Sequence, residues 1–350
     1  MRWKDFGMVQ SFTPRFERMV LSALDDLGRK IDASLARDVM ALSDFYLAHP
    51  GVHTPWHEPF ARPAYVSYFQ PLNYARLRAV FNELKRFLPP ETIREVWDFG
   101  SGIGATHWAL EDEDWLPPRP LYCLERAREA TEYHRRLAGS TDARWTPEFI
   151  SLQSRRRPEP GALAVFSYSF LEMRDALPLW QEFEHILILE PSTRECGRQL
   201  QAWRVPFMDK GFTPLAPCTH ASDCPLLLHS NKDWCHARIA LEPPEWFQTL
   251  ESLLPMKNRT LTYSYLLLSR GVRDEAWRGA ARVIGDTLEE RGKTRQMICR
   301  GPEREFLSWL HRHGEPARIP SGALLRGTES CTLKGSELRV EPSSGIEWTE

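Results

Sequence analysis

The chain has 350 residues, enough for two domains or for one large domain with additions. Its formal net charge is −2, so any contact with nucleic acid must come from local basic patches rather than from bulk charge. No apolar stretch reaches the length of a membrane span, and the first residues lack the apolar run of a signal peptide. We therefore expect a cytoplasmic protein.

The first ninety residues have the pattern of helices. Apolar residues recur at three- and four-residue spacing, which predicts a helix over 15–48. After a proline-rich break, a second helical pattern runs from Leu72 to Phe87 and ends before Pro89 and Pro90. We expect residues 1–90 to form a helical N-terminal region.

From residue 94 the pattern changes to strands that alternate with helices. Such an alternation predicts βαβ units and a parallel sheet. The last two strands resemble the reversed hairpin that completes the sheet of a class I S-adenosylmethionine-dependent methyltransferase. The expected fold is therefore an α/β, Rossmann-like sheet over 91–270. Its predicted strands lie within or at the start of the segments 94–99, 121–125, 162–173, 185–192, 211–217 and 260–270.

A cysteine-containing segment separates the last two predicted strands of this sheet. We interpret residues 216–258 as a metal-binding insertion. Beyond residue 270 the apolar runs are short and separated by turns, which predicts a small β domain over 271–350.

The stretch DFGSGIG, residues 98–104, follows a predicted strand and opens a predicted helix. Glycines at that position let the backbone approach a cofactor closely. The next strand ends in Glu125, whose carboxylate can accept hydrogen bonds from both hydroxyls of a ribose. The turn suits a dinucleotide or S-adenosylmethionine, and an acid at the strand end favours the second. The cofactor-binding residues we predict are Asp98, Gly100, Gly102, Gly104 and Glu125; the alternative is a structural turn that binds nothing.

The sequence assigns no catalytic residue. The loop after the fourth predicted strand reads SYSFLEM and contains no NPPY-type motif for an exocyclic amine. Tyr168 and Glu172 are candidates for orienting a methyl acceptor. The alternative is that they pack and cap a helix.

Three of the seven cysteines lie together in the polar segment 216–236. In a cytosolic protein such clustering favours metal or redox chemistry over disulfides. Cys218, Cys224 and Cys235 would need a fourth ligand, either a local histidine or the distant Cys299; the local candidates are His220, His229 and His236. Thiolates suit zinc or an iron–sulfur cluster, and the alternative is three inert cysteines.

Three motifs together resemble the mitochondrial small-ribosomal-subunit methyltransferase-like family and its bacterial homologues. They are DFGSGIGATHWA, the segment APCTHASDCPL with DWCH, and TYSYLLLSR; the stretch AYVSYFQPLNYARLRAVFNEL is similar as well. The resemblance covers most of residues 60–310. It implies a class I methyltransferase fold and binding of the small ribosomal subunit and its rRNA during ribosome assembly or translation. It does not imply that methyl transfer occurs.

The resemblance also implies a 4Fe–4S cluster held by four cysteines. Three of them match Cys218, Cys224 and Cys235, and the fourth, beyond the sheet, matches Cys299. Cys123, Cys196 and Cys331 match no ligand position, so we expect them to be ordinary small side chains.

An RNA partner calls for basic residues. Arg291, Lys293, Arg295 and Arg300 surround Cys299, and no acid lies between 291 and 300. Such a patch suits phosphate; Arg155, Arg156 and Arg157 form a shorter run that fits a solvated surface better. We expect a monomer when free. The alternatives are an active methyltransferase on another substrate with a structural zinc site, and a cluster-binding module with a vestigial cofactor pocket.

Overall fold

The computed structural model describes residues 9–49, 51–139, 143–173, 178–271 and 279–349. They divide into two compact units. The N-terminal unit contains residues 10–183 and 241–259, and the C-terminal unit contains residues 9, 184–240 and 260–349. These units are not the segments 1–90, 91–270 and 271–350, whose status as domains stays a prediction. Within the described ranges, no helix is long and apolar enough to cross a membrane.

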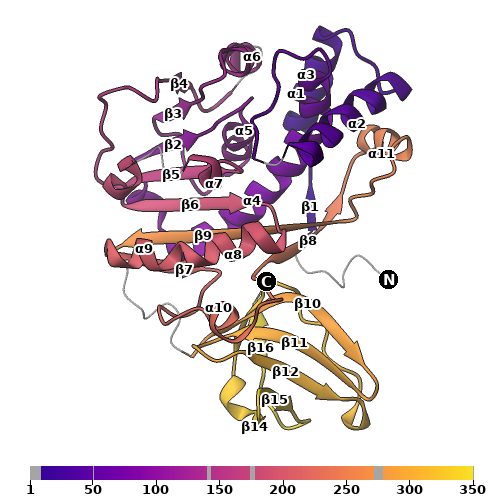
Figure 1. The fold of residues 1–350 in the computed structure, drawn as a ribbon, viewed down its shortest axis with the longest axis vertical. Coiled ribbons are helices and arrows are strands. Elements are labelled where there is room, and N and C mark those ends of the chain that lie inside the picture. The colour runs from indigo at the N-terminus through magenta and orange to yellow at the C-terminus, as the bar shows by residue number, and fades with distance from the viewer. Residues whose placement is uncertain (1–8, 50, 140–142, 174–177, 272–278, 350) are drawn as a thin grey trace. The chain divides into compact units, whose positions relative to one another are not determined.

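The N-terminal unit is an α/β structure with four parallel strands in the order β5-β2-β3-β4 (Figure 1). Its strands are β2 (Glu95–Phe99), β3 (Leu121–Leu124), β4 (Pro147–Phe149) and β5 (Ala162–Ser167). Its helices are α1 (Pro14–Asp26), α2 (Ala33–Ala48), α3 (Ala61–Ala64), α4 (Gln70–Phe87), α5 (Ala105–Glu111), α6 (Arg128–Gly139), α7 (Phe170–Met173) and α11 (Glu245–Ser252). A π-helical turn, Tyr65–Phe69, joins α3 to α4.

The prediction of one helix over 15–48 is wrong, because the chain forms two helices there. Gly28 adopts a φ of +62°, a conformation that glycine enters without steric cost, and α1 ends just before it. The Asp32 side chain then accepts hydrogen bonds from the backbone N–H groups of Ser34 and Leu35, which caps the start of α2. The other predicted helix, 72–87, is confirmed as the main part of α4.

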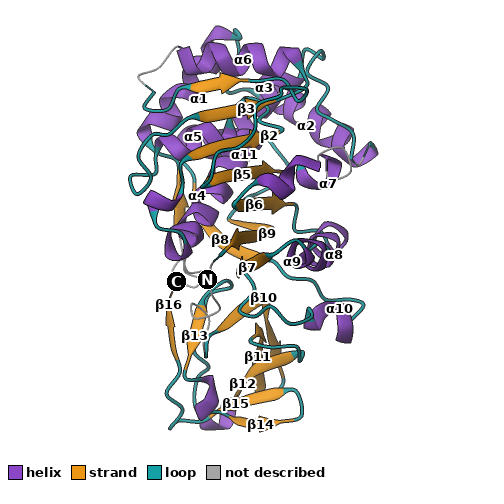
Figure 2. Ribbon diagram, turned by 90° about the vertical axis from the view of Figure 1, so that its left-hand side faces the viewer, coloured by secondary structure: helices purple, strands orange, loops and turns teal. Residues whose placement is uncertain are grey.

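The C-terminal unit contains two sheets. In the first, β9 (Thr260–Arg270) pairs antiparallel with both β6 (His185–Glu190) and β7 (Phe212–Ala216), so β6 and β7 run parallel to each other. The first half of β9 also pairs with β8 (Ala237–Glu242). The expected reversed hairpin and the Rossmann-like, class I methyltransferase class of fold are therefore confirmed. Helix α8 (Arg194–Ala202) packs on β9, α9 (Arg204–Asp209) packs on β7, and α10 (Pro225–His229) contacts α8 (Figure 2).

The second sheet confirms the β structure predicted beyond residue 270. Strands β10, β11 and β12 form an antiparallel meander, and β15 pairs in parallel with β12. Its buried side chains include Val283, Ile298, Leu307 and Leu325. The strands are β10 (Ala281–Glu290), β11 (Lys293–Cys299), β12 (Glu305–Leu310), β13 (Leu324–Arg326), β14 (Thr332–Lys334), β15 (Glu337–Val340) and β16 (Glu347–Thr349); the short strand β1 (Val9–Ser11) lies at the other end of the chain.

Two buried histidines support the start of α5. His107 Nε2 lies 3.1 Å from the Trp145 carbonyl oxygen, and His107 Nδ1 lies 3.1 Å from His134 Nε2. Because a carbonyl only accepts, we assign the hydrogen of His107 to Nε2, so that His134 Nε2–H donates to His107 Nδ1. Burial, the neighbouring His107 and Arg135 hold the pKa of His134 well below its usual value. The His134 ring is therefore neutral in the folded chain.

This arrangement predicts that acid destabilises the N-terminal unit through His134. Its folded pKa is lowered, so the unfolded chain binds the proton first as the pH falls below about 6.5. The stability that depends on neutral His134 is complete above that pH and decreases below it, by at most about 1.4 kcal/mol per pH unit. Urea unfolding over about pH 7.5 to 5 should therefore show a weaker pH dependence for His134→Leu than for the wild type. The control is His313→Leu at an exposed position; an equal pH dependence in wild type and His134→Leu would contradict the assignment.

Candidate functional site

The glycine turn lies where β2 ends and α5 begins, at the carboxyl end of a parallel strand. Gly100, Gly102 and Gly104 have φ values of +71°, +52° and +94°. All three lie in the left-handed region that residues with a Cβ rarely adopt. The backbone N–H of Gly100 donates to the Leu124 carbonyl at 2.8 Å, which joins the turn to the end of β3.

The three glycines have different surroundings. A Cβ at Gly100 would lie 2.6 Å from Ser169 Cβ, and one at Gly104 would collide with the His134 ring. These two positions therefore need glycine for packing within the protein. A Cβ at Gly102 would meet only Trp56 at 3.8 Å and the Tyr65 hydroxyl at 3.9 Å, which is ordinary contact. Among the three, Gly102 is the one that borders space beside two aromatic rings.

Glu125 is hydrogen-bonded to this turn. Its Oε2 accepts a hydrogen bond from the Gly102 backbone N–H at 3.0 Å, and its Oε1 accepts one from the Ala127 backbone N–H at 2.7 Å. Each carboxylate oxygen retains a further lone pair. The side chain is therefore fixed in direction and can still accept hydrogen bonds from a ligand.

Asp98 is buried, with 1% of its surface exposed. Its Oδ1 accepts a hydrogen bond from the Thr106 hydroxyl at 2.9 Å, while its Oδ2 has no partner among the described residues. Burial raises the pKa of Asp98 to about 7, against the Thr106 bond and with a small contribution from the charge of Glu125. A buried acceptor without a partner is costly, so this oxygen suits a bound donor group.

The sequence interpretation missed Trp56 and Tyr65, which form an aromatic wall beside Gly102. Their ring centroids are 4.9 Å apart, at an interplanar angle of 57°. Tyr65 opens the π-helical turn Tyr65–Phe69, and such turns occur often at functional sites. In the sequence, only the family resemblance of the segment that begins at Ala64 could have pointed to Tyr65, because no periodic pattern predicts a π-helical turn.

The catalytic candidates Tyr168 and Glu172 follow β5 in the same unit. Tyr168 has a φ of +61°, which is unusual for a residue with a large side chain. Glu172 Oε2 lies 3.1 Å from His53 Nδ1, and burial raises the pKa of Glu172 to about 7 against the nearby Arg126. The loop therefore combines backbone strain with an acid whose proton can exchange near neutral pH.

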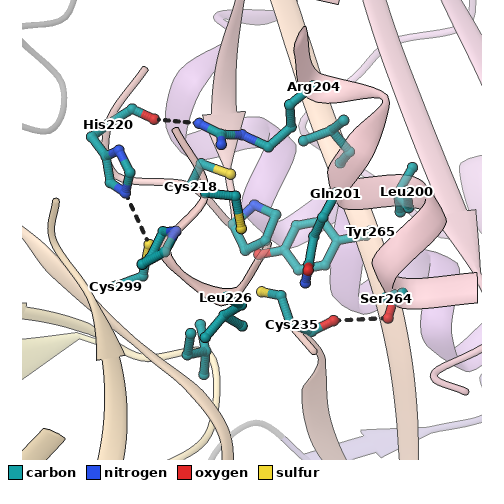
Figure 3. A pocket seen from close by; sticks show the side chains of 16 residues that line it. Leu200, Gln201, Arg204, Cys218, His220, Leu226, Cys235, Ser264, Tyr265 and Cys299 are labelled. Atoms are coloured by element: carbon teal, nitrogen blue, oxygen red, sulfur yellow. Dashed lines mark hydrogen bonds between the residues drawn. The ribbon is translucent and has the colours of Figure 1, made fainter. Parts of the chain in front are cut away.

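The four predicted cysteine ligands line one cavity in the C-terminal unit (Figure 3). Cys218 follows β7, Cys224 precedes α10, Cys235 precedes β8, and Cys299 ends β11. The Thr219 hydroxyl donates to the Cys299 carbonyl at 2.8 Å, which joins the cysteine segment to the second sheet. Thiols separated by more than sixty residues in sequence are therefore brought together by the fold.

Buried arginine side chains lie close to the thiols of this cavity. Burial raises the pKa values of Cys218 and Cys235, and it raises that of Cys299 to about 12. Arg204, with 2% of its surface exposed, has a raised pKa because the nearby thiols outweigh its burial. Arg282 is also buried and lies opposite Cys299 in the pairing of β10 with β11. Two buried cations thus lie close to the thiols and favour their ionised forms.

The three histidines that could replace Cys299 as a ligand differ in position. His220 lines the cavity, and its Nε2 lies 3.3 Å from the Cys299 sulfur. Burial, with the charge of Arg204, lowers the pKa of His220 to about 4. His229 lies 3.8 Å from Glu303, and His236 Nδ1 lies 3.3 Å from the Trp234 carbonyl. Only His220 among them is a lining residue.

No group of three or more His, Cys, Asp or Glu side chains in the described ranges has a geometry that would hold one metal ion. The remaining cysteines, Cys123, Cys196 and Cys331, are free thiols that do not line the cavity.

The predicted RNA-binding residues lie on or next to β11, and most of them are paired with acids. Lys293 Nζ lies 2.5 Å from Glu337, and Arg295 contacts Glu290. Arg300 makes two hydrogen bonds to the Glu305 carboxylate, at 2.6 and 2.9 Å. Arg291 is exposed in the turn between β10 and β11. Of the shorter run, Arg157 pairs with Glu182 at 2.6 Å.

A sequence profile described as mitochondrial small ribosomal subunit Rsm22 matches residues 60–315. The chain belongs to the Rsm22 family. The resemblance stated from the motifs is thereby confirmed, and the matched region contains the glycine turn, Glu125, all four cavity cysteines and the basic residues of β11. A comparison with curated proteins found no match.

Several solved methyltransferase structures align with the chain. The 16S rRNA methylase RmtB has 13% identity and a TM-score of 0.34 over 74% of this chain and 100% of its own. TYW2 of M. jannaschii, in complex with AdoMet, has 11% identity and a TM-score of 0.32 over 55% of this chain and 76% of its own. The N-terminal domain of human METTL16, in complex with SAH, has 10% identity and a TM-score of 0.35 over 57% of this chain and 70% of its own.

Proposed function

We propose that this Rsm22-family protein binds S-adenosylmethionine and a 4Fe–4S cluster, and that it associates with the small ribosomal subunit through rRNA. The observation that carries the proposal is the convergence of Cys218, Cys224, Cys235 and Cys299 on one cavity. Membership of a family described by a mitochondrial small ribosomal subunit protein supports the ribosomal partner. The protein would act there as a methyltransferase-like binding factor.

The residues around the glycine turn suit S-adenosylmethionine. Glu125 would accept hydrogen bonds from the ribose hydroxyls, because the backbone N–H groups of Gly102 and Ala127 hold its carboxylate in place. The unpartnered Oδ2 of Asp98 would accept from the amino group of the methionyl part. Trp56 and Tyr65 would pack against the flat purine ring. When bound, this cofactor supplies an electrophilic methyl group.

The cavity suits an iron–sulfur cluster better than zinc. A zinc ion binds sulfur at about 2.3 Å, so all four thiolates would have to converge on one point. The described residues offer no such single-ion geometry, although the four thiols surround a common space. A cubane cluster binds each thiolate to a different iron atom, which leaves the sulfur atoms further apart. The buried Arg204 and Arg282 would offset the negative charge of the thiolates and the cluster.

The exposed Arg291 is the best candidate for a phosphate contact on β10–β11. Lys293, Arg295 and Arg300 are already paired with Glu337, Glu290 and Glu305, so their charges are largely compensated. Lys293 and Arg295, which follow the turn, would help to hold the strands that present Arg291, whereas Arg300 lies beyond the other end of β11. We therefore expect the rRNA contact at this turn to be electrostatic and sensitive to salt.

The first prediction concerns the cofactor. Glu125→Gln keeps the shape of the side chain but removes its charge, so we expect about 10- to 100-fold weaker binding of S-adenosylmethionine. Titration calorimetry on the whole chain measures this. Glu132→Gln on the exposed face of α6 is the matched control and should bind like the wild type. No binding by the wild type at about 1 mM cofactor would show a vestigial pocket.

A second prediction concerns the fourth ligand. Protein purified without oxygen should contain iron and sulfide, and Cys299→Ser should lose most of both. The same variant should be cleaved earlier between residues 218 and 236 by limited proteolysis, because metal-binding free energy stabilises that segment. Cys331→Ser, at a thiol outside the cavity, is the control. If Cys299→Ser kept its iron, His220 would be the fourth ligand instead.

A third prediction concerns the ribosome. Arg291→Glu should weaken co-sedimentation with small ribosomal subunits and reduce the slope of log K against log salt by about 1. Lys334→Glu makes the same charge change at another exposed position of the second sheet and serves as the control. Equal binding by both variants and the wild type would remove the β10–β11 turn from the interface.

A further inference from the structure

The thiol cavity is also lined by a buried amide that has no partner. Gln201, on α8, has only 7% of its surface exposed, and neither its Nε2 nor its Oε1 makes a hydrogen bond with the described residues. Buried polar groups in folded proteins are almost always satisfied. An apolar side chain would fill the same place without this cost, so the amide points to a polar occupant of the cavity.

Two neighbouring residues show the same feature. Arg204 uses its Nη2 to donate to the carbonyl oxygens of His220 and Ser222, at 2.9 and 3.0 Å, but its Nε has no partner in the described ranges. His220 bonds through Nε2 toward Cys299, while its Nδ1 has no partner there. Both side chains line the same cavity as Gln201.

The placement of these groups is regular. Gln201 lies near the end of α8 and Arg204 begins α9, so the two project from one side of a continuous helical segment. Figure 3 shows the Gln201 side chain directed into the space between Cys218 and Cys235, with Arg204 on the far side of Cys218. The cavity therefore has thiols on the side of the cysteine segment and N–H donors on the side of the helices.

We propose that Gln201 and Arg204 are positioning residues that donate N–H hydrogen bonds to the sulfur atoms of the bound cluster and raise its reduction potential. This inference rests on the proposed 4Fe–4S site. Sulfide and thiolate sulfurs accept hydrogen bonds, and donors aimed at them stabilise the reduced, more negative cluster. A lone zinc ion in the same place would offer no inorganic sulfide to accept these hydrogen bonds.

Gln201→Met is the decisive variant, because methionine has nearly the same length and no hydrogen-bonding amide. In cluster-loaded protein, we expect a more negative reduction potential by redox titration, and loss of the visible absorption in air at least about tenfold faster. In metal-free protein, thermal unfolding should occur at the same temperature as in the wild type or higher, since an unsatisfied buried amide is removed.

Gln199→Met on the same helix is the matched control. Its amide lies 3.4 Å from Glu195 and does not line the cavity, so both the potential and the rate of cluster loss should match the wild type. Gln201→Glu provides a second variant that keeps the polar shape but replaces the donor by an acceptor. It should lower the potential further than Gln201→Met.

The possible results distinguish the proposed cluster from the proposed role of Gln201. Zinc or no metal in anaerobically purified wild type would overturn the cluster itself. A 4Fe–4S cluster whose potential and stability are unchanged in both Gln201 variants would overturn the role of Gln201 alone, and so would an equal loss of thermal stability in metal-free and loaded Gln201→Met. The latter result would mean that Gln201 only packs, with water satisfying its amide.

Discussion

The C-terminal unit contains a cavity lined by buried polar atoms that have no hydrogen-bond partner among the described residues. Three thiols of the cysteine segment and the thiol of Cys299 at the end of β11 line it. Unpartnered atoms of Gln201, Arg204 and His220 line it as well. Each unsatisfied buried polar group costs about 1–3 kcal/mol. The cysteine segment has only a short helix, α10, and little apolar core of its own. An occupant that binds thiolates and accepts hydrogen bonds would compensate both deficits, because its binding free energy contributes to folding.

The same rule of sheet geometry places the two candidate sites. The glycine turn follows β2, which pairs in parallel with β5. Cys218 follows β7, which runs in the same direction as β6 because both strands pair antiparallel with β9. Each site thus lies at the carboxyl end of a strand in its own unit. In open α/β sheets, ligands bind at that end. The N-terminal site uses backbone N–H groups and carboxylates, which suit hydroxyl and amino groups. The C-terminal site uses thiols and cations, which suit a metal–sulfur centre.

Much of the fold could be predicted because local patterns determine it. The apolar runs of β5, β6 and β9 identify these strands directly, and DFGSGIG identifies the turn between β2 and α5. The break between α1 and α2 was missed, although Gly28 and Asp32 are ordinary helix stop and start signals. The helical spacing of apolar residues continues across Gly28 and Asp32, so this spacing alone predicted one helix.

The remaining features depend on contacts between distant residues. Nothing in the sequence around Lys293 shows that Glu337 will lie beside it, so a run of cations predicted a free basic patch where the fold forms ion pairs. Tyr65 lies near the glycine turn as the first residue of a π-helical turn, and Trp56, from the segment before α3, packs against Tyr65. Gln201 lies in an amphipathic helix that contains no sequence motif. Only the folded structure shows that its buried amide has no hydrogen-bond partner among the described residues.

Native mass spectrometry of protein purified without oxygen tests the central claim most directly, because it weighs the occupant of the cavity together with the folded chain. The account predicts a species heavier than the chain by four iron and four sulfide ions, which falls to the mass of the chain alone after oxidation in air. A species that carries a single zinc ion, or a folded chain that carries no added mass, would contradict it.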